Sequence, residues 1–303
     1  MGNRGRQFEL RQSVTRRSVL LTALAAAAMT SVSAAEEAPP KAVAVLARWI
    51  AETVIALGVV PKALPELVRS QIWRGVPLQH GIHDLGLAGE PNLEFLEQLH
   101  LDLILVDGRL QSAWIDRLGR IAPVVPATIY TPERTPYIFA EAETLRLGTL
   151  MMSGNAAARY VDAYNGVIQA SREALSDFRD RPVFVVRMID ARNVMLHCGG
   201  SIFHDVLIRL GIMPAASMAN DWGFLTVGIE TLAASPAARI VYFEPVPTAA
   251  ERLFSRPSLW SHLPSVQEGL VTAIPELYAW GALPTAKRFA ELLAERLPRE
   301  GAG

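Results

Sequence analysis

The chain has 303 residues, of which 50% are hydrophobic and 19% charged, so it can bury a sizeable core and does not have the composition of a disordered chain. The formal net charge is −1, but five arginines and one acid lie in the first 35 residues, which leaves 24 bases and 29 acids for the rest. This excess of acids argues against nucleic acid or an anionic membrane surface as a partner, because both call for a basic face. The single cysteine, Cys198, excludes an intramolecular disulfide and a cysteine-rich metal site.

The first 35 residues predict an export signal. Arg16 and Arg17 precede an apolar run over residues 19–29, which is too short to span a bilayer. An arginine pair directly before such a run is typical of the twin-arginine motif of proteins that are exported in the folded state, and an ordinary secretory signal is the alternative. Cleavage after Ala34 or Ala35 leaves no cysteine for a lipid anchor. We therefore expect the mature protein to be free in the periplasm.

Short β-rich runs alternate with helical stretches in residues 36–145, and this alternation predicts an N-terminal α/β lobe with a mainly parallel sheet. The β-rich runs are 42–46, 101–106 and 124–130, and the helical stretches include 49–57 and 92–100.

Residues 146–180 predict a connecting helical segment. Apolar side chains recur at helical spacing from Asn155 onward, so we expect one long helix over about 154–178 and a shorter helix that begins near residue 141 before it.

Residues 181–303 predict a second α/β lobe. The β-rich runs 183–189 and 194–197 flank four turn residues and predict a hairpin, and a strand at 239–243 and an amphipathic helix at 285–297 follow. The predicted fold class is therefore α/β, with two lobes joined by a single long helix and a cleft between them where a ligand can bind.

Short segments spread over nearly the whole mature chain match one known family in their order and spacing. They are 56–61, 84–87 and 90–94 in the first lobe, and 189–192, 200–203, 210–212, 220–223, 227–232, 257–260 and 278–282 in the second. On these segments the chain resembles the periplasmic iron(III)-hydroxamate binding proteins of Gram-negative bacteria.

The resemblance implies a periplasmic binding protein fold with a rigid connecting helix, little domain closure, an aromatic-lined cleft, no cofactor and no catalysis. The implied function is capture of a ferric siderophore of the hydroxamate type by a monomeric protein, which delivers it to an inner-membrane ABC permease with its cytoplasmic ATPase. Members of that family present one acid from each lobe to arginines of the permease, and Glu94 and Glu230 stand at those positions. The alternative for each is a solvated carboxylate at the start of a helix.

A hexadentate siderophore supplies all six oxygen donors that Fe(III) prefers, so no metal ligand is expected from the protein and recognition must use outer-sphere contacts. Aromatic rings suit the apolar frame of the siderophore, and hydrogen-bond donors suit its metal-bound oxygens. The candidate ligand-binding residues are Trp49, Trp73 and Arg109 in the first lobe and Asn220, Trp222, Tyr278 and Trp280 in the second. Core packing is the alternative for Trp49, Trp73 and Tyr278, and a solvated loop position is the alternative for Arg109.

One departure from the family leaves the ligand open. Ala88 stands where ferrichrome-type binders carry an arginine that donates to the hydroxamate oxygens, and Arg109 could supply this cation from another backbone position. A different hydroxamate, a mixed citrate-hydroxamate or another ferric chelate is therefore an alternative ligand.

Two competing functions are weighed against siderophore binding. A binder of haem, cobalamin or a metal ion on the same fold would use a tyrosine or convergent histidines, which the spacing of the six histidines does not demand. A periplasmic enzyme could use Ser201 with His204, but Ser201 is better explained as the N-cap of a helix over 202–210. No nucleophile elbow, dinucleotide fingerprint or phosphate loop is present, so we expect no catalytic residue.

Overall fold

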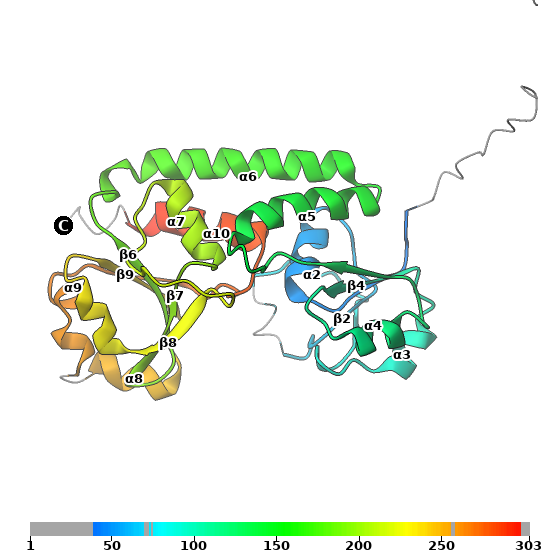
Figure 1. Cartoon of the computed structure of the whole chain (residues 1–303), viewed down its shortest axis with the longest axis horizontal. Helices are drawn as coiled ribbons and strands as arrows, with labels where there is room; N and C mark the ends of the chain where they lie inside the picture. Colours follow the sequence, from blue (N-terminus) through cyan, green and yellow to red (C-terminus); the bar gives the residue numbers. More distant parts are fainter. Residues whose placement is uncertain (1–38, 70–72, 74, 256–257, 298–303) are drawn as a thin grey trace, which may run out of the picture. The chain divides into compact units, whose positions relative to one another are not determined.

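The computed structural model describes residues 39–69, 73, 75–255 and 258–297. The predicted export signal, with its arginine pair, lies outside these residues. The described residues form two five-stranded sheets flanked by helices (Figure 1). No helix within the described ranges is both long and apolar enough to cross a membrane.

The first sheet is entirely parallel, which confirms the predicted sheet type. Its strands are β1 (Val43–Val45), β2 (Ala63–Leu64), β3 (His83–Asp84), β4 (Leu103–Asp107) and β5 (Val124–Ala127), in the order β3-β2-β1-β4-β5. The helices between these strands are α2 (Arg48–Ala56), α3 (Leu93–Gln98) and α4 (Ser112–Leu118). Parallel neighbours need such crossover connections, and this need explains the alternation of strand and helix in the sequence.

The chain passes from the first sheet to the second through two helices, α5 (Pro136–Leu150) and α6 (Gly154–Ala174). Helix α5 begins earlier than expected, because Pro136 occupies its first turn, where proline is favoured. Helix α6 is followed by the 3₁₀ turn η2 (Ser176–Phe178). The sequence predicts a single long helix over about 154–178, and these two elements occupy that range. A rigid connection through one helix, and the predicted lobe boundaries, stay predictions.

The second sheet is mixed. Its strands are β6 (Val183–Met188), β7 (Asn193–His197), β8 (Phe224–Gly228), β9 (Arg239–Glu244) and β10 (Val271–Pro275), in the order β10-β9-β6-β7-β8. Strand β7 is antiparallel to β6 and to β8, and Val186 pairs with Leu196, which confirms the predicted hairpin. The remaining neighbours are parallel.

The helices of the second half are α7 (Ile202–Leu210), η3 (Ile229–Ala234), α8 (Thr248–Ser255), η4 (Trp260–His262), α9 (Pro264–Gln267) and α10 (Leu283–Arg296). Helix α7 begins as the sequence predicts, because the Ser201 hydroxyl accepts a hydrogen bond from the backbone N–H of Phe203 at 3.2 Å. This cap accounts for Ser201 without any role as a nucleophile.

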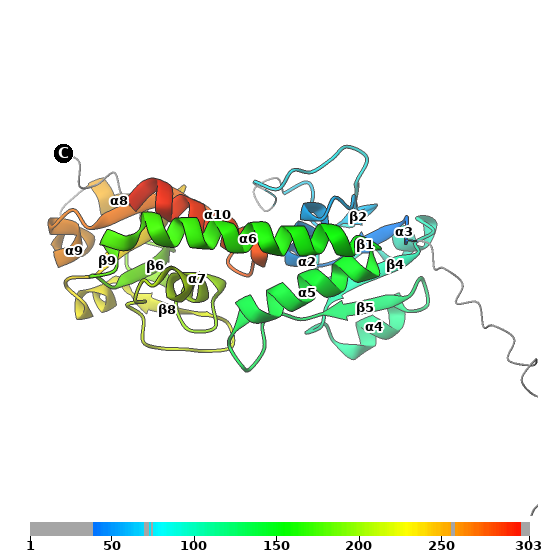
Figure 2. The same ribbon diagram turned by 90° about the horizontal axis from the view of Figure 1, so that it is seen from above.

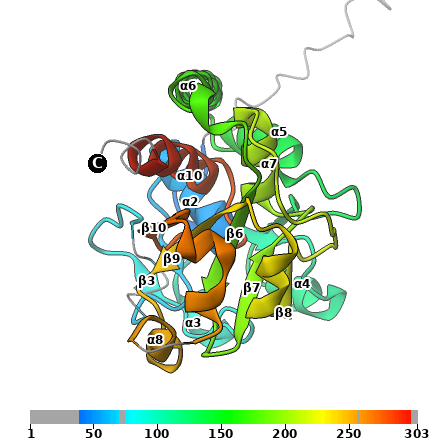
Figure 3. The same ribbon diagram turned by 90° about the vertical axis from the view of Figure 1, so that its left-hand side faces the viewer.

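One apolar core lies beneath α2, α5, α6, α7 and α10 and continues along one face of each sheet. Side chains alternate between the faces of a strand, so Val45 and Val185 join this core, while Ala44 and Val186 face smaller cores on the opposite sides of their sheets. Helix α6 packs against α5, α7 and α10, as Figures 2 and 3 show. The helices that cover both sheets are therefore parts of one packed layer.

Candidate ligand-binding cavity

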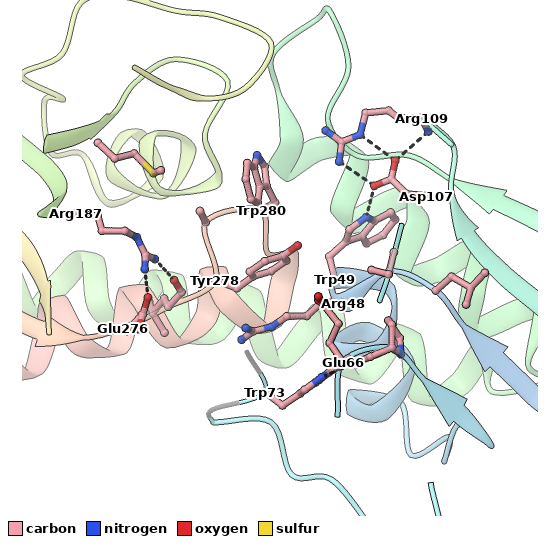
Figure 4. Close-up of a pocket in the computed structure, with 17 residues that line it drawn as sticks. Arg48, Trp49, Glu66, Trp73, Asp107, Arg109, Arg187, Glu276, Tyr278 and Trp280 are labelled. Carbon is pink, nitrogen blue, oxygen red and sulfur yellow. Dashed lines mark hydrogen bonds and ion pairs between the residues drawn. The ribbon is translucent and has the colours of Figure 1, made fainter. Parts of the chain in front are cut away.

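A cavity of about 600 Å³ lies at the carboxyl ends of the parallel strands of the first sheet (Figure 4). The segments that follow β1, β2 and β4 line it, and the segment 276–280 after β10 forms the opposite wall together with Arg187 of β6 and Met195 of β7. Loops at the carboxyl ends of parallel strands meet at one edge of the sheet, which makes this edge the usual place for a ligand. The volume lies in the range of small-molecule sites.

Asp107, at the end of β4, organises the wall from the first sheet. Its carboxylate accepts hydrogen bonds from Nε and Nη2 of Arg109, each at 2.9 Å, and from the indole N–H of Trp49 at 3.0 Å. Burial alone would raise the pKa of Asp107, but these hydrogen bonds outweigh it and hold the pKa below its ordinary value. The hydrogen bonds between Arg109 and Asp107 also raise the pKa of Arg109. Both groups therefore stay charged, and Arg109 has a fixed orientation.

Arg109 remains accessible although it is paired. Its side chain is 40% exposed, and its guanidinium carbon lies 5.6 Å from the centre of the Tyr130 ring. Asp107 uses two of the five N–H donors of the guanidinium group, so donors remain for a ligand in the cavity.

Arg48 connects the two walls of the cavity. Its Nε donates to Oε1 of Glu52 at 2.7 Å, and its guanidinium carbon lies 4.4 Å from the centre of the Tyr278 ring, a cation–π contact. Glu52 is only 6% exposed and also accepts a hydrogen bond from the Thr285 hydroxyl at 3.0 Å. Burial raises the pKa of Glu52 despite the arginine beside it, and burial also raises the pKa of Tyr278 to about 12.

Arg187 fixes the segment after β10. It forms an ion pair with Glu276 and donates from Nη2 to the carbonyl oxygen of Leu277 at 2.8 Å. Burial, and secondly the nearby Arg48, lower the pKa of Arg187. The carbonyl and carboxylate partners of Arg187 come directly before Tyr278, so this arginine sets the position of the aromatic residues that follow.

Four aromatic candidates line the cavity. Trp49 and Trp73 are buried, and Trp73 donates its indole N–H to the Pro65 carbonyl at 3.1 Å, so both pack in the core and also line the cavity. Tyr278 and Trp280 face them from the opposite wall. The rings of Tyr278 and Trp280 pack edge to face, and their centres lie 6.1 Å apart. The structure therefore brings together five of the seven candidate residues, these four aromatic residues and Arg109.

Asn220 and Trp222 do not line this cavity. The Asn220 side chain holds a turn, because it donates to the Phe224 carbonyl at 2.8 Å and accepts from the backbone N–H of Trp222 at 3.1 Å. Trp222 is 60% exposed, whereas Phe224 packs edge-to-face against Trp280 at 5.5 Å. Their contact with a ligand stays a prediction.

The two candidate docking acids are exposed. Glu94 lies in the first turn of α3, and Glu230 lies in the first turn of η3. Their positions fit both a docking role and a carboxylate that stabilises a helix start.

Sequence reasoning missed Arg48, Arg187 and Glu276 as cavity residues. The signal for Arg187 was present, since it interrupts an apolar strand with a charge that needs a partner. Ala88 lines the same cavity as Arg109. Among the described residues, no group of three or more His, Cys, Asp or Glu side chains could hold a metal ion.

Comparison with known proteins identifies related chains. Residues 43–278 match the sequence model of the periplasmic binding protein family. The iron(3+)-hydroxamate-binding protein FhuD of Escherichia coli is 26% identical over 281 residues, which cover 90% of this chain and 94% of that protein. Both comparisons point to binding proteins rather than enzymes.

Solved structures agree with this relationship. The siderophore-binding protein FhuD of Vibrio cholerae with bound Fe³⁺–Desferal superposes with a TM-score of 0.77 at 26% identity, over 86% of this chain and 98% of that one. The triscatecholate siderophore-binding protein FeuA of Bacillus subtilis, with ferri-bacillibactin, superposes with a TM-score of 0.65 at 17% identity, over 87% and 94% of the two chains, which shows a shared fold.

Proposed function

This chain belongs to the periplasmic binding protein family, and we propose that it is the substrate-binding component of an ABC importer that captures a ferric hydroxamate siderophore in the cavity beside Arg109 and Trp280. The family consists of binding proteins, so the ligand is cargo rather than a cofactor and no catalysis is involved. The similarity to binders of ferric hydroxamates in Escherichia coli and Vibrio cholerae supports this ligand class.

The charge balance of the cavity is the observation that carries the proposal. Among the described residues, its lining contains three arginines, Arg48, Arg109 and Arg187, and three acids, Glu66, Asp107 and Glu276. Three hydroxamates neutralise Fe(III), whereas three catecholates leave a complex with three negative charges. This balance of charge among the described lining residues suits the neutral complex, because a buried anion without a matching cation is costly.

We propose that Arg109 donates to the metal-bound oxygens of the siderophore. A charge-assisted hydrogen bond to such an oxygen is stronger than a neutral one, and Asp107 already holds the guanidinium group in place. Ala88 lines the same cavity, so Arg109 would supply a cation to the site in place of the arginine that ferrichrome-type binders carry at the position of Ala88.

The aromatic residues would contact the apolar frame of the siderophore. Trp49, Trp73, Tyr278 and Trp280 line both walls, and flat rings suit the hydrocarbon linkers between hydroxamate groups. Asn220 would act indirectly, because it holds the turn that places Phe224 against Trp280. Trp222 would meet only a part of the ligand that projects out of the cavity.

Delivery would take place in the periplasm, after export by the predicted twin-arginine signal. We propose that the protein acts as a monomer and that Glu94 and Glu230 dock on arginines of the permease. Their exposure on separate lobes supports this role.

A titration followed by tryptophan fluorescence tests the ligand class. The purified protein without its predicted signal is titrated with ferric hydroxamates, ferric citrate-hydroxamates, ferric catecholates, haem and cobalamin, with iron-free siderophores as controls. Saturable quenching by a ferric trihydroxamate, after correction for absorption by the ligand, is the expected result. A response only to a catecholate, haem or cobalamin would overturn the hydroxamate assignment.

A charge reversal tests the docking role separately. We expect Glu94→Arg combined with Glu230→Arg to abolish siderophore-dependent growth while ligand affinity stays unchanged. Glu97→Arg on the same helix α3 is the matched control and should support growth. Normal growth of the double variant would refute the docking role.

A further inference from the structure

A second cavity, of about 330 Å³, lies beside the main one, and we call it the tail cavity. It lies between α2, the segment 75–77, the segment 275–278 and the start of α10. Arg48, Glu276, Leu277 and Tyr278 line both cavities. One layer of side chains therefore separates the two spaces.

The dividing layer is formed by two side chains that stack on each other. Arg48 lies against the Tyr278 ring and is held from the other side by Glu52, as Figure 4 shows for the arginine and the tyrosine. Arg48 is 13% exposed and lines both cavities. A ligand in the main cavity thus lies one side chain away from the tail cavity.

The lining of the tail cavity is mostly apolar. Ile55 and Ala56 of α2 contribute to it, and Val76, Leu277 and Pro284 contribute from the segments around them.

The charged groups at the tail cavity already have partners. Glu52 pairs with Arg48, Glu276 pairs with Arg187, and Arg288 lies 3.6 Å from Glu291. A charged group would therefore find no unpaired partner among the described lining residues, whereas an uncharged apolar group needs no such partner and gains from being removed from water.

We propose that the tail cavity takes an uncharged alkyl or acyl arm of a siderophore whose ferric core occupies the main cavity. The inference rests on the proposed function and narrows it to ferric hydroxamates that carry an apolar arm. The volume equals roughly that of eleven water molecules in the liquid, which is enough for a short alkyl chain.

The test uses two derivatives of the ferric trihydroxamate Desferal, one with an acetyl group and one with a hexanoyl group on its amine. Their iron centres are identical and both are uncharged, so they differ only in four methylene groups. Isothermal titration calorimetry gives the dissociation constant and, from several temperatures, the heat-capacity change. We expect the hexanoyl derivative to bind at least about tenfold tighter, with the more negative heat-capacity change, because each buried methylene contributes about fourfold and burial of two of the four already gives about sixteenfold.

Two substitutions locate the effect. Ala56→Trp fills the tail cavity from an exposed position at the end of α2, and it should remove the advantage of the hexanoyl group. Ile55→Gln, a second variant in the same lining, should reduce it. Ala163→Trp on α6 is the matched control, because Ala163 is also an exposed helical alanine and lines neither cavity; it should keep the full advantage.

The outcomes separate this inference from the proposed function. Equal affinity for the two derivatives in the unmodified protein would overturn the proposed role of the tail cavity while leaving hydroxamate binding intact. The same holds if the hexanoyl derivative still binds more tightly than the acetyl derivative in Ala56→Trp. If neither derivative binds, the inference fails, and if no other ferric hydroxamate binds either, the proposed function fails with it.

Discussion

The two walls of the main cavity are held in place in different ways. The wall from the first sheet is fixed locally, because Trp49 and Arg109 both donate to Asp107 at the end of β4. The wall from the second lobe is an irregular segment, 276–280, whose position depends on Arg187 and on contacts with the first lobe. Two such contacts are the Arg48–Tyr278 stack and the hydrogen bond of 2.8 Å from the Tyr130 hydroxyl to the Gly281 carbonyl.

The two walls therefore contribute differently to ligand affinity and to stability. The first wall offers a preorganised cation for the ligand, and preorganisation reduces the entropy lost on binding. The second wall keeps its place through Arg187 and through the contacts between the lobes. Substitutions in the first wall should therefore act mainly on affinity, and substitutions in the second wall or at the contacts between the lobes should act mainly on stability.

The largest expected effect is on the contact between the lobes. Glu52→Ala leaves the guanidinium of Arg48 nearly buried without its carboxylate and breaks the hydrogen bond to Thr285. Removal of one partner of a buried ion pair should lower the free energy of unfolding by about 3 kcal/mol. Urea denaturation measures this loss. Glu97→Ala on the surface of α3 is the control and should change the free energy of unfolding by less than about 0.5 kcal/mol. An equally small loss for Glu52→Ala would show that the contact does not stabilise the fold.

The next effect is on affinity through the first wall. Arg109→Ala should weaken binding of a ferric hydroxamate by about 2 kcal/mol, or roughly thirtyfold, because one charge-assisted hydrogen bond is lost. Calorimetry measures the affinity, and the melting temperature should fall modestly, because Arg109 is itself 40% exposed but Asp107 loses its charged partner. Arg109→Lys should bind with intermediate affinity, since a lysine keeps the charge and loses the forked geometry. Unchanged affinity in Arg109→Ala would remove this residue from the site.

Acid should lower the free energy of unfolding through His197 at a higher pH than through Asp107. His197 is buried among Phe203, Phe224 and Phe243, and burial lowers its pKa to about 3, with a smaller contribution from Arg187. The unfolded chain, with an ordinary histidine pKa near 6.5, binds this proton first, so stability falls as the pH drops from about 6.5 towards 3.

The expected loss is about 2 kcal/mol at pH 5 relative to pH 7. Denaturation at several pH values measures it, and His197→Phe should flatten the profile, whereas His80→Gln at an exposed position should retain it. The pKa of Asp107 is shifted in the same direction as that of His197, but its ordinary value is near 4, so the stability that Asp107 contributes is lost only in stronger acid. A profile that stays equally steep in His197→Phe would assign the acid sensitivity to other groups.

The smallest effect is expected at the exposed turn. Trp222→Ala should change the free energy of unfolding by less than about 0.5 kcal/mol, because the side chain is 60% exposed. Its effect on ligand affinity should be smaller than that of Trp280→Ala, because Trp280 lines the cavity. A larger loss of affinity in Trp222→Ala would extend the site beyond the cavity.

The elements that local patterns specify were predictable from the sequence. The alternation of β-rich and helical runs predicted the parallel sheet, and the turn residues at 190–193 predicted the hairpin of β6 and β7. The cap at Ser201 was predictable because it needs only neighbouring residues. Strands β2 and β3 have two residues each, too few for a periodic pattern, and they were missed.

The cavity was predictable in part. Aromatic residues and Arg109 stood out because their chemistry suits the ligand, and five of the seven candidates line the cavity. Arg48 and Glu52 did not stand out, because their significance comes from Tyr278 and Thr285, which are more than two hundred residues away in the chain. No local pattern reports a pairing between such distant residues.

A crystal structure of the protein with a ferric trihydroxamate, with data collected at the iron absorption edge, tests the proposed site most directly. The proposal predicts one anomalous iron peak in the main cavity, with Arg109 within hydrogen-bond distance of a metal-bound oxygen and no protein atom among the six iron ligands. An iron peak outside this cavity, or one with a protein side chain in the coordination sphere, would contradict it.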